Sequence, residues 1–264
     1  MNIRKALAYL FEHSGISILK TSNLIAMNIY RETLEKNERK MNFFVNIDKS
    51  DRIYDIWKSC QASTSQLGAE LLLLKMFNFK RNGFFIECGA GDGKHLSNSY
   101  LLEKDFGWSG ILVEPNRSFH SSLCRDRQVK IETKLLSTQS GEIFQFEENL
   151  IGELSAISKY SKDHDQKSKN VYEVESISLF DLLSKYGAPE VIDYFSLDVE
   201  GHEYEILKDF DFSSYKFLFL SIEHNYQASR EDIYKLMLEN GYKRVFEEIS
   251  LFDDFYIYNE TLKG

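Results

Sequence analysis

Cysteine is scarce in this chain of 264 residues, which has three, at Cys60, Cys88 and Cys124. Because their number is odd and they are widely separated, the sequence predicts neither a disulfide framework nor a zinc site. Long apolar runs are also missing, and no stretch approaches the length of a membrane-spanning helix. The apolar segment at 6–11 is short and lacks a cleavage site, so no secretory leader is expected. These absences predict a soluble protein of the reducing cytoplasm.

Basic residues are outnumbered, with 32 Lys and Arg against 41 Asp and Glu and a formal net charge of −9. Residues 1–60 carry ten basic against seven acidic side chains, so the acidic excess lies in residues 61–264. Nucleic acid is therefore not expected as a partner, because binding phosphates requires a basic surface. Length and a hydrophobic content of 43% suffice for one sizeable core. We expect one domain at 61–264 and a helical extension at 1–60 that caps it or joins a homodimer.

The stretch 83–93 combines an apolar run with three alternate glycines and reads Gly-Phe-Phe-Ile-Glu-Cys-Gly-Ala-Gly-Asp-Gly. This pattern predicts a β-strand, a tight turn and then a helix. Glycine suits such a turn because a Cβ would hinder a positive φ and would hold a ligand away from the backbone. The stretch therefore predicts a site for a nucleotide-like ligand.

The spacing of the glycines separates two kinds of ligand. A dinucleotide fingerprint would place its third glycine at position 94, where this chain has Lys94. The acids Glu87 and Asp92 would repel a pyrophosphate and attract a cationic ligand. A sulfonium cofactor with an amino-acid tail fits these charges better than a nicotinamide dinucleotide does.

A second apolar run, at 110–114, ends in Glu114, which lies 21 residues beyond Gly93. In parallel sheets, a carboxylate that ends the neighbouring strand usually accepts hydrogen bonds from the two hydroxyls of a ribose. We therefore expect Glu114 to bind the ribose of the cofactor.

Strand and helix patterns alternate along the rest of the chain. Strands are predicted at 129–136, 142–146, 171–177, 191–199 and 215–222, followed by a closing pair at 242–248 and 252–258, and helices at 67–77, 179–186, 204–210 and 231–240. The alternation predicts a doubly wound parallel sheet with an antiparallel edge, in which ligands bind outside the carboxyl ends of the strands. The polar stretch 147–169 is predicted to be a loop over the site.

Two of these strands end in clusters of acids and histidines. The predicted catalytic residues are Asp198, Glu200, His202, Glu223 and His224. An alcohol that accepts a methyl group from a sulfonium must lose its proton, either to a histidine or carboxylate, or after a divalent metal has lowered the hydroxyl pKa. The predicted ligands of such a metal, Mg²⁺ or Mn²⁺, are Asp198, Glu223 and His224, with Glu200 beside them.

Four motifs resemble those of one known family. They are Ser-Asn-Ser at 97–99, Gly-Trp-Ser-Gly at 107–110, Ile-Leu-Val-Glu-Pro-Asn at 111–116 and Ser-Leu-Asp-Val-Glu-Gly-His-Glu at 196–203. From about residue 66 to 258, the chain resembles the FkbM-type S-adenosylmethionine-dependent methyltransferases. It departs from them at His202, where a small residue such as Ala is usual, and near Ser137, where an acid or Asn usually follows the third strand.

The resemblance implies a fold and an activity. The fold is α/β, a class I Rossmann-like methyltransferase fold with a seven-stranded, mostly parallel sheet and an antiparallel edge strand. The activity is O-methylation of a hydroxyl on a sugar, glycoconjugate or natural product, so the partner is a small-molecule or glycan acceptor. Two alternatives stay open: a non-catalytic S-adenosylmethionine-binding module that docks a partner enzyme, and an NAD-dependent oxidoreductase.

The resemblance also assigns residues to the cofactor. The implied binding set is Glu87, Gly89, Ala90, Gly91, Asp92, Gly93, Asn98, Glu114, Pro115, Asn116, Ser137 and Asp198. Asp198 would lie near the reactive methyl group. Glu200, His202, Glu223 and His224 would face the acceptor.

Overall fold

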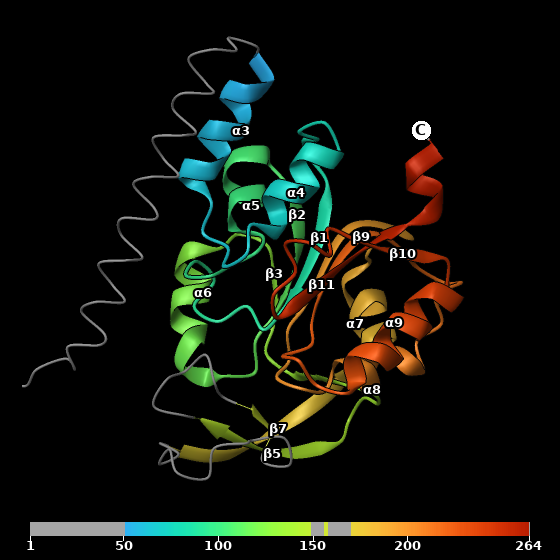
Figure 1. The fold of residues 1–264 in the computed structure, drawn as a ribbon. Coiled ribbons are helices and arrows are strands. Elements are labelled where there is room, and N and C mark those ends of the chain that lie inside the picture. Colours follow the sequence, from blue (N-terminus) through green and yellow to red (C-terminus); the bar gives the residue numbers. More distant parts are fainter. Residues whose placement is uncertain (1–50, 149–155, 158–169, 264) are drawn as a thin grey trace, which may run out of the picture. The chain divides into compact units, whose positions relative to one another are not determined.

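The computed structural model describes residues 51–148, 156–157 and 170–263 (Figure 1). The chain divides into two compact units, residues 1–58 and 59–264. Helix α3 (Asp51–Ala62) begins in the first unit, and the rest of the predicted helical extension lies outside the described residues. Most of the loop predicted at 147–169 also lies outside them. None of the described helices combines the length and apolar character that crossing a membrane requires.

The main sheet of the second unit has seven strands. In spatial order these are β10 (Tyr242–Val245), β11 (Asp253–Tyr258), β9 (Lys216–Glu223), β8 (Val191–Leu197), β1 (Phe84–Cys88), β2 (Ser109–Val113) and β3 (Lys130–Glu132). Neighbouring strands from β9 to β3 are parallel, whereas β11 is antiparallel to both β9 and β10. The predicted α/β fold with a seven-stranded, mostly parallel sheet is confirmed. The antiparallel strand β11 lies one place in from the edge, where β10 is outermost.

Helices cover both faces of this sheet (Figure 1). One face carries α4 (Ala69–Met76), α5 (Tyr100–Phe106) and α6 (His120–Asp126), and the other carries α7 (Leu179–Tyr186), α8 (Glu203–Lys208) and α9 (Ser229–Glu239). Successive residues of a strand point to opposite faces, so Phe85 packs in the first layer and Ile86 in the second, both fully buried. Burial on both faces explains why β1 is apolar throughout rather than alternating.

A second sheet, which the sequence analysis did not predict, has the order β4 (Leu135–Ser137), β7 (Asn170–Ser178), β5 (Ile143–Glu148) and β6 (Ala156–Ile157). The single strand predicted at 129–136 is therefore wrong, because β3 and β4 belong to different sheets. The break has a local cause: Glu132 Oε1 accepts hydrogen bonds from the backbone N–H groups of Thr133 and Lys134, at 3.0 and 3.1 Å. These bonds turn the chain out of the main sheet.

Candidate active site

A cleft of 330 Å³ opens at the carboxyl ends of the parallel strands. The lining includes the ends of four strands, as predicted: Glu87 of β1, Glu114 after β2, Asp198 and Glu200 after β8, and Glu223 of β9. This convergence follows from the topology, because parallel strands present their carboxyl ends at one edge of the sheet.

The glycine-rich turn forms one wall of the cleft. Gly89 has a φ of 81°, and a Cβ added to it would lie 2.1 Å from the carbonyl oxygen of Asp198. The turn after β1 can therefore approach the end of β8 only because this residue has no side chain. Gly91 also has a positive φ, of 52°, but no atom lies within 4 Å of an added Cβ. Gly91 and Ala90 both line the cleft.

Glu87 is 3% exposed and is held by the turn that leads into α5. Its carboxylate accepts hydrogen bonds from Ser97 Oγ at 2.9 Å, from the backbone N–H of Asn98 at 2.6 Å and from Ser99 Oγ. A guanidinium nitrogen of Arg127, Nη1, lies 3.8 Å from the same carboxylate. The negative charge of Glu87 is thus fixed against the cleft wall by groups of this chain.

Arg127 is buried and was not predicted as a site residue. It donates hydrogen bonds to the carbonyl oxygen of Gly93 at 2.9 Å and to the hydroxyls of Ser97 and Ser99. A Cβ added to Gly93 would lie 2.7 Å from Leu123 Cδ2, so α6 packs directly on the turn. Arg127 therefore supports this wall of the cleft without lining the cleft itself.

Asp92 and Gly93, both predicted cofactor contacts, are not among the residues that line the cleft. The carboxylate of Asp92 accepts hydrogen bonds from the backbone N–H groups of Lys94 and His95, at 2.8 and 2.7 Å. Asp92 closes the turn by this local bonding, as short acidic side chains often do. The predicted attraction of a cationic ligand therefore depends on Glu87 rather than on Asp92.

Glu114 is 5% exposed and joins two parts of the cleft wall. Its carboxylate accepts hydrogen bonds from the backbone N–H of Asn116 and from that of Gly91, both at 2.7 Å. Burial raises the pKa of Glu114 to about 7, against the lowering effect of these two N–H groups, and the charge of Asp198 adds to the rise. Each oxygen keeps a lone pair that could accept a further hydrogen bond.

An apolar slot lies beside Glu114 in the cleft. Its lining residues are Pro115, Phe119, Leu135, Leu136 and Phe146. Of these, only Pro115 was predicted, because the others come from a short 3₁₀ helix (Arg117–Phe119) and from the second sheet. Flat apolar walls of this kind suit a purine ring.

Three predicted cofactor contacts lie around the cleft rather than in this slot. Asn116 is buried and caps the 3₁₀ helix by accepting a hydrogen bond from the backbone N–H of Ser118 at 3.0 Å. Ser137 is buried, and its Oγ lies 3.3 Å from His202 Nε2. Asn98 does line the cleft, and its side chain donates to Ser196 Oγ at 3.0 Å.

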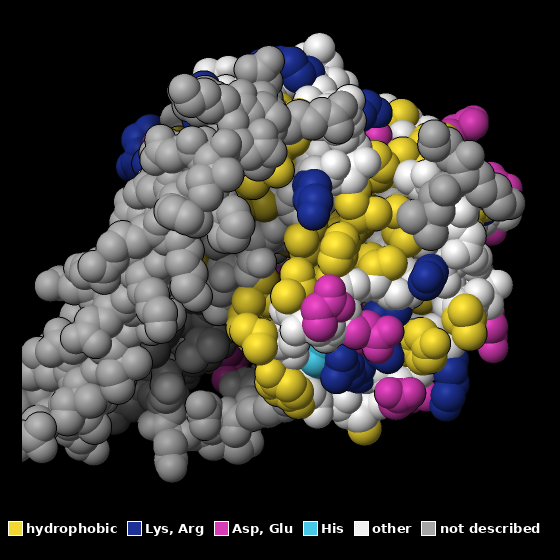
Figure 2. Space-filling model, turned by 45° about the horizontal axis from the view of Figure 1, so that its top comes forward, with side chains coloured by type: hydrophobic (Ala, Val, Ile, Leu, Met, Phe, Trp, Pro, Cys, Tyr) yellow, Lys and Arg dark blue, Asp and Glu magenta, His cyan; other side chains and the backbone are white. Residues whose placement is uncertain are grey.

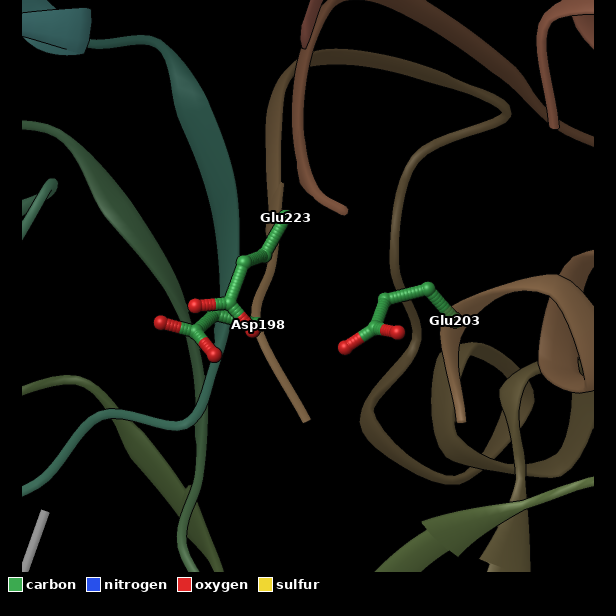
Figure 3. Close-up of side chains that lie close together, drawn as sticks. All are labelled: Asp198, Glu203 and Glu223. Atoms are coloured by element: carbon green, nitrogen blue, oxygen red, sulfur yellow. The ribbon is translucent and has the colours of Figure 1, made fainter. Parts of the chain in front are cut away.

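Three carboxylates converge where β8 and β9 end (Figure 3). Asp198 and Glu223 line the cleft, whereas Glu203 is not among its lining residues. Asp198, Glu203 and Glu223 each offer an oxygen, and these oxygens lie within 4.8 Å of one another. Asp198 and Glu223 share a hydrogen bond. Burial raises the pKa of both groups above the ordinary value. The charge of Glu203 raises both further, and the charge of Asp198 raises that of Glu223, whereas the hydrogen bond from Glu223 lowers the pKa of Asp198. Two carboxylates this close either share a proton, so that only one is ionised, or stay ionised together with a cation between them.

A fourth carboxylate, Asp253, joins this end from the antiparallel strand β11. Asp253 lies directly opposite Glu223 in the β9–β11 pairing, lines the cleft and is 8% exposed. Burial raises its pKa to about 7, and the charges of Asp254 and Glu203 contribute. The sequence analysis missed Asp253 as a site residue, because only the pairing of β11 with β9 brings it beside Glu223.

Neither predicted catalytic histidine lines the cleft. His224 Nδ1 accepts a hydrogen bond from the backbone N–H of Tyr226 at 3.0 Å, and Nε2 lies 3.7 Å from Asp254 Oδ1. His202 is 7% exposed and contacts Ser137. The structure thus brings Asp198, Glu200 and Glu223 together, and Glu203 takes the place that the predicted metal set gave to His224.

The backbone around this end is strained. Glu200, Leu96 and Asn225 line the cleft with φ values of 58°, 58° and 42°. Such values are uncommon for residues with a side chain, and they concentrate at functional sites. Gln66 also lines the cleft.

Two exposed apolar side chains are sequence neighbours of residues that line the cleft. Tyr226 is 70% exposed and Leu251 is 52% exposed, and their neighbours Asn225 and Phe252 line the cleft. Figure 2 shows a face of the molecule on which hydrophobic side chains gather beside acidic and basic ones. Tyr226 and Leu251 are therefore exposed apolar side chains that neighbour cleft-lining residues in the sequence.

The strand order, the glycine-rich turn after the first strand and the acid that ends the second define a class I S-adenosylmethionine-dependent methyltransferase. Residues 87–244, more than half of the chain, match the methyltransferase FkbM domain, and the chain belongs to this family. The predicted family is thereby confirmed.

No curated protein sequence matches the chain. Among solved structures, the chain is similar to precorrin-6y C5,15-methyltransferase from Geobacter metallireducens GS-15, with 11% identity, a TM-score of 0.40 and coverage of 75% of this chain and 93% of that one. It is also similar to a chain of the fibrillarin/Nop5p complex, with 15% identity, a TM-score of 0.37 and coverage of 74% and 80%. At these scores, neither structure informs the site.

Proposed function

We propose that this methyltransferase transfers the methyl group of S-adenosylmethionine to a hydroxyl of a sugar, glycoconjugate or natural product. The observation that carries the proposal is the pair Asp198 and Glu223, which both line the cleft and place carboxylate oxygens within 4.8 Å of each other. A carboxylate pair with raised pKa values is suited to take a proton from an alcohol near neutral pH.

The cleft fits the cofactor in shape and in charge. The apolar slot would take the adenine, Glu114 the ribose hydroxyls, and the glycine turn with Glu87 the methionine end. The cleft is lined by acidic residues, and no Lys or Arg occurs in the described lining. The acidic residues are Glu87, Glu114, Asp198, Glu200, Glu223 and Asp253. This charge favours a sulfonium and disfavours the phosphates of a dinucleotide. S-adenosylmethionine, when bound, supplies an electrophilic methyl group.

The contribution of the protein is then alignment, exclusion of water and proton removal. The ionised member of the Asp198–Glu223 pair would accept the proton of the acceptor hydroxyl. Glu200 and Asn225 border this position and would orient the acceptor. A divalent ion, Mg²⁺ or Mn²⁺, at the same carboxylates is a second way to lower the hydroxyl pKa.

Calorimetric titration with S-adenosylhomocysteine tests the cofactor half of the proposal. We expect Glu114→Ala to weaken binding by about 10- to 100-fold, because it removes hydrogen bonds to a charged group. Glu190→Gln is the matched control, since Glu190 is exposed and precedes the opposite end of β8. Absence of binding by the wild type would overturn the proposal, and NADH fluorescence enhancement would then favour an oxidoreductase.

Methyl transfer to a panel of glycans and small alcohols, with and without Mg²⁺ or Mn²⁺, tests the acceptor half. We expect Asp198→Asn to lower the rate by about 100-fold, the range of general base catalysis, because Asp198 is the member of the pair that is ionised near neutral pH: its pKa is about 7, whereas the pKa of Glu223 is raised to about 11. Cofactor binding without transfer to any alcohol would favour a non-catalytic module that docks a partner enzyme. A cytoplasmic location and a homodimer formed through residues 1–60 stay predictions.

A further inference from the structure

We propose that the acidic end of the cleft binds one divalent cation of the Mg²⁺ or Mn²⁺ type through Asp198, Glu203 and Glu223, with Asp253 as a fourth carboxylate. The inference rests on the proposed function only in placing the cation beside the acceptor. The proposed ligands differ from the set predicted from the sequence: they include Glu203 and Asp253 and exclude His224.

The first support is the arrangement of the three ligands. Asp198 follows β8, Glu223 ends β9 and Glu203 begins α8, so three separate elements bring their oxygens within 4.8 Å of one another (Figure 3). An all-oxygen set suits hard cations such as Mg²⁺ and Mn²⁺, whereas zinc prefers nitrogen and sulfur ligands.

The second support is independent of that cluster and comes from Asp253. Asp253 is 8% exposed and lines the cleft. None of the described residues donates a hydrogen bond to its carboxylate. Burying a carboxylate without a partner is costly. Since no Lys or Arg occurs in the described lining, a bound cation is the partner that this cleft leaves room for.

The third support is that the ligand loop is held in one conformation. Glu203 Oε1 accepts hydrogen bonds from the backbone N–H groups of Val199 and Gly201, both at 3.0 Å. Gly201 and Glu200 have φ values of 104° and 58°, so the loop turns sharply between Asp198 and Glu203. This turn places both carboxylates on the same side, which lowers the cost of organising them around an ion.

A cation here would have a clear consequence for the reaction. It would lie where the acceptor hydroxyl must approach, and a hydroxyl bound to a divalent cation has a lowered pKa. The reaction would then not depend on His202 or His224, in agreement with their positions outside the cleft lining.

Titration of the full chain with MnCl₂, followed by calorimetry and by the electron paramagnetic resonance of free Mn²⁺, tests the proposal. We expect wild-type binding in the micromolar to low millimolar range, as for oxygen sites of this type. Glu203→Gln should weaken Mn²⁺ binding by about tenfold or more and Asp253→Asn by a smaller factor, since each removes one ligand charge. Glu190→Gln, remote from the cleft, should bind Mn²⁺ as the wild type does.

Titration of the same samples with S-adenosylhomocysteine separates the two proposals. Cofactor binding without Mn²⁺ binding would overturn the cation site and leave the proposed function standing. Mn²⁺ binding without cofactor binding would do the reverse. If Glu203→Gln does not fold, as judged by its melting curve, Asp253→Asn decides, and Mn²⁺ affinity equal to that of the wild type would overturn the proposal.

Discussion

Glu87 and Arg127 bind the same two hydroxyl groups. Ser97 Oγ lies 2.9 Å from a carboxylate oxygen of Glu87 and 3.2 Å from a guanidinium nitrogen of Arg127. Ser99 Oγ contacts the same two side chains, at 2.8 Å from Arg127. The wall of the cofactor cleft therefore contains a buried ion pair that two serines bridge.

Removing the positive member of this pair should destabilise the whole domain. We expect Arg127→Met to lower the free energy of unfolding by about 3–5 kcal/mol, because it leaves the largely buried carboxylates of Glu87 and Glu103, which lie 3.8 and 2.5 Å from the guanidinium, without this positive partner. Urea denaturation measures the change. Arg125→Met is the matched control: the Arg125 side chain is 70% exposed and pairs with Asp126 at the surface, so the expected loss is below about 1 kcal/mol. Equal losses for both variants would contradict the structural role given to Arg127.

The two turn glycines should respond differently to a single methyl group. We expect Gly89→Ala to prevent folding, because its Cβ would meet the backbone oxygen of Asp198 at 2.1 Å, and backbone cannot move aside as a side chain can. Gly91→Ala meets no atom and should cost only the left-handed backbone penalty of about 1–2 kcal/mol. Because Gly91 lines the cleft, its variant should fold but bind S-adenosylhomocysteine about tenfold more weakly. Melting curves and calorimetry test both, and a stable Gly89→Ala protein would be the contrary result.

Stability should depend on the protonation of Glu114. Its pKa rises from an ordinary 4.5 to about 7 in the folded state. Between these values the folded form keeps a proton that the unfolded form has released, so the stability contributed by Glu114 falls as pH rises from about 4.5 to about 7, by about 3 kcal/mol in all. Comparing urea denaturation of the wild type and Glu114→Gln from pH 5 to 8 isolates this group from the other acids. Parallel curves for the two proteins would contradict the prediction.

The affinity for the cofactor should also depend on the protonation of Glu114, but it should increase with pH, whereas the stability contributed by Glu114 decreases. Only the ionised carboxylate of Glu114 can accept hydrogen bonds from both ribose hydroxyls, so binding of S-adenosylhomocysteine should tighten as pH rises through about 7. Glu114→Gln should bind more weakly and lack this pH dependence. Calorimetry at pH 6 and pH 8 makes the comparison.

The apolar slot should contribute affinity without contributing charge. We expect Phe119→Ala to weaken S-adenosylhomocysteine binding by about tenfold, because it removes one apolar wall of the adenine position. Phe180→Ala is the control, since Phe180 is 48% exposed and packs against Tyr215 away from the cleft. An unchanged affinity in Phe119→Ala would place the adenine elsewhere.

The strand ends were predictable from the sequence, but the direction of each side chain was not. Apolar runs located Glu87, Glu114, Asp198 and Glu223 at one edge of the sheet, because parallel strands must end together. His224 was grouped with Glu223 because the two are adjacent in sequence. In a strand, adjacent side chains point to opposite faces.

The pairing of β9 with β11 places the side chains of β11 on the same two faces as those of Glu223 and His224. Glu223 lies opposite Asp253 and both line the cleft, whereas Asp254, the next residue of β11, lies beside His224. Asp254 is 1% exposed and accepts two hydrogen bonds from Arg230, at 2.9 and 2.7 Å. Because side chains alternate between the two faces, Glu223 and Asp253 point into the cleft. Their neighbours His224 and Asp254 point to the other face and contact each other. No periodicity in the sequence states which strand pairs with which, so Asp253 could not be found in advance.

The second sheet marks another limit of sequence reasoning. Phe146 reaches the cleft only because β5 pairs with β7 outside the main sheet. Arg127 likewise acts through groups that are distant in sequence, such as Gly93. Arg127 and Gly93 are 34 residues apart and the paired residues of β5 and β7 are 22 to 32 apart, and local patterns carry no information about such pairs.

The position of β11 has a consequence for how the domain folds. β11 follows β10 in the chain but lies between β10 and β9. During synthesis, β10 therefore has no partner in the sheet until β11 has been made and inserted. The same strand carries Asp253 into the cleft, so a ribosome-bound chain that stops short of β11 would lack this part of the cleft wall.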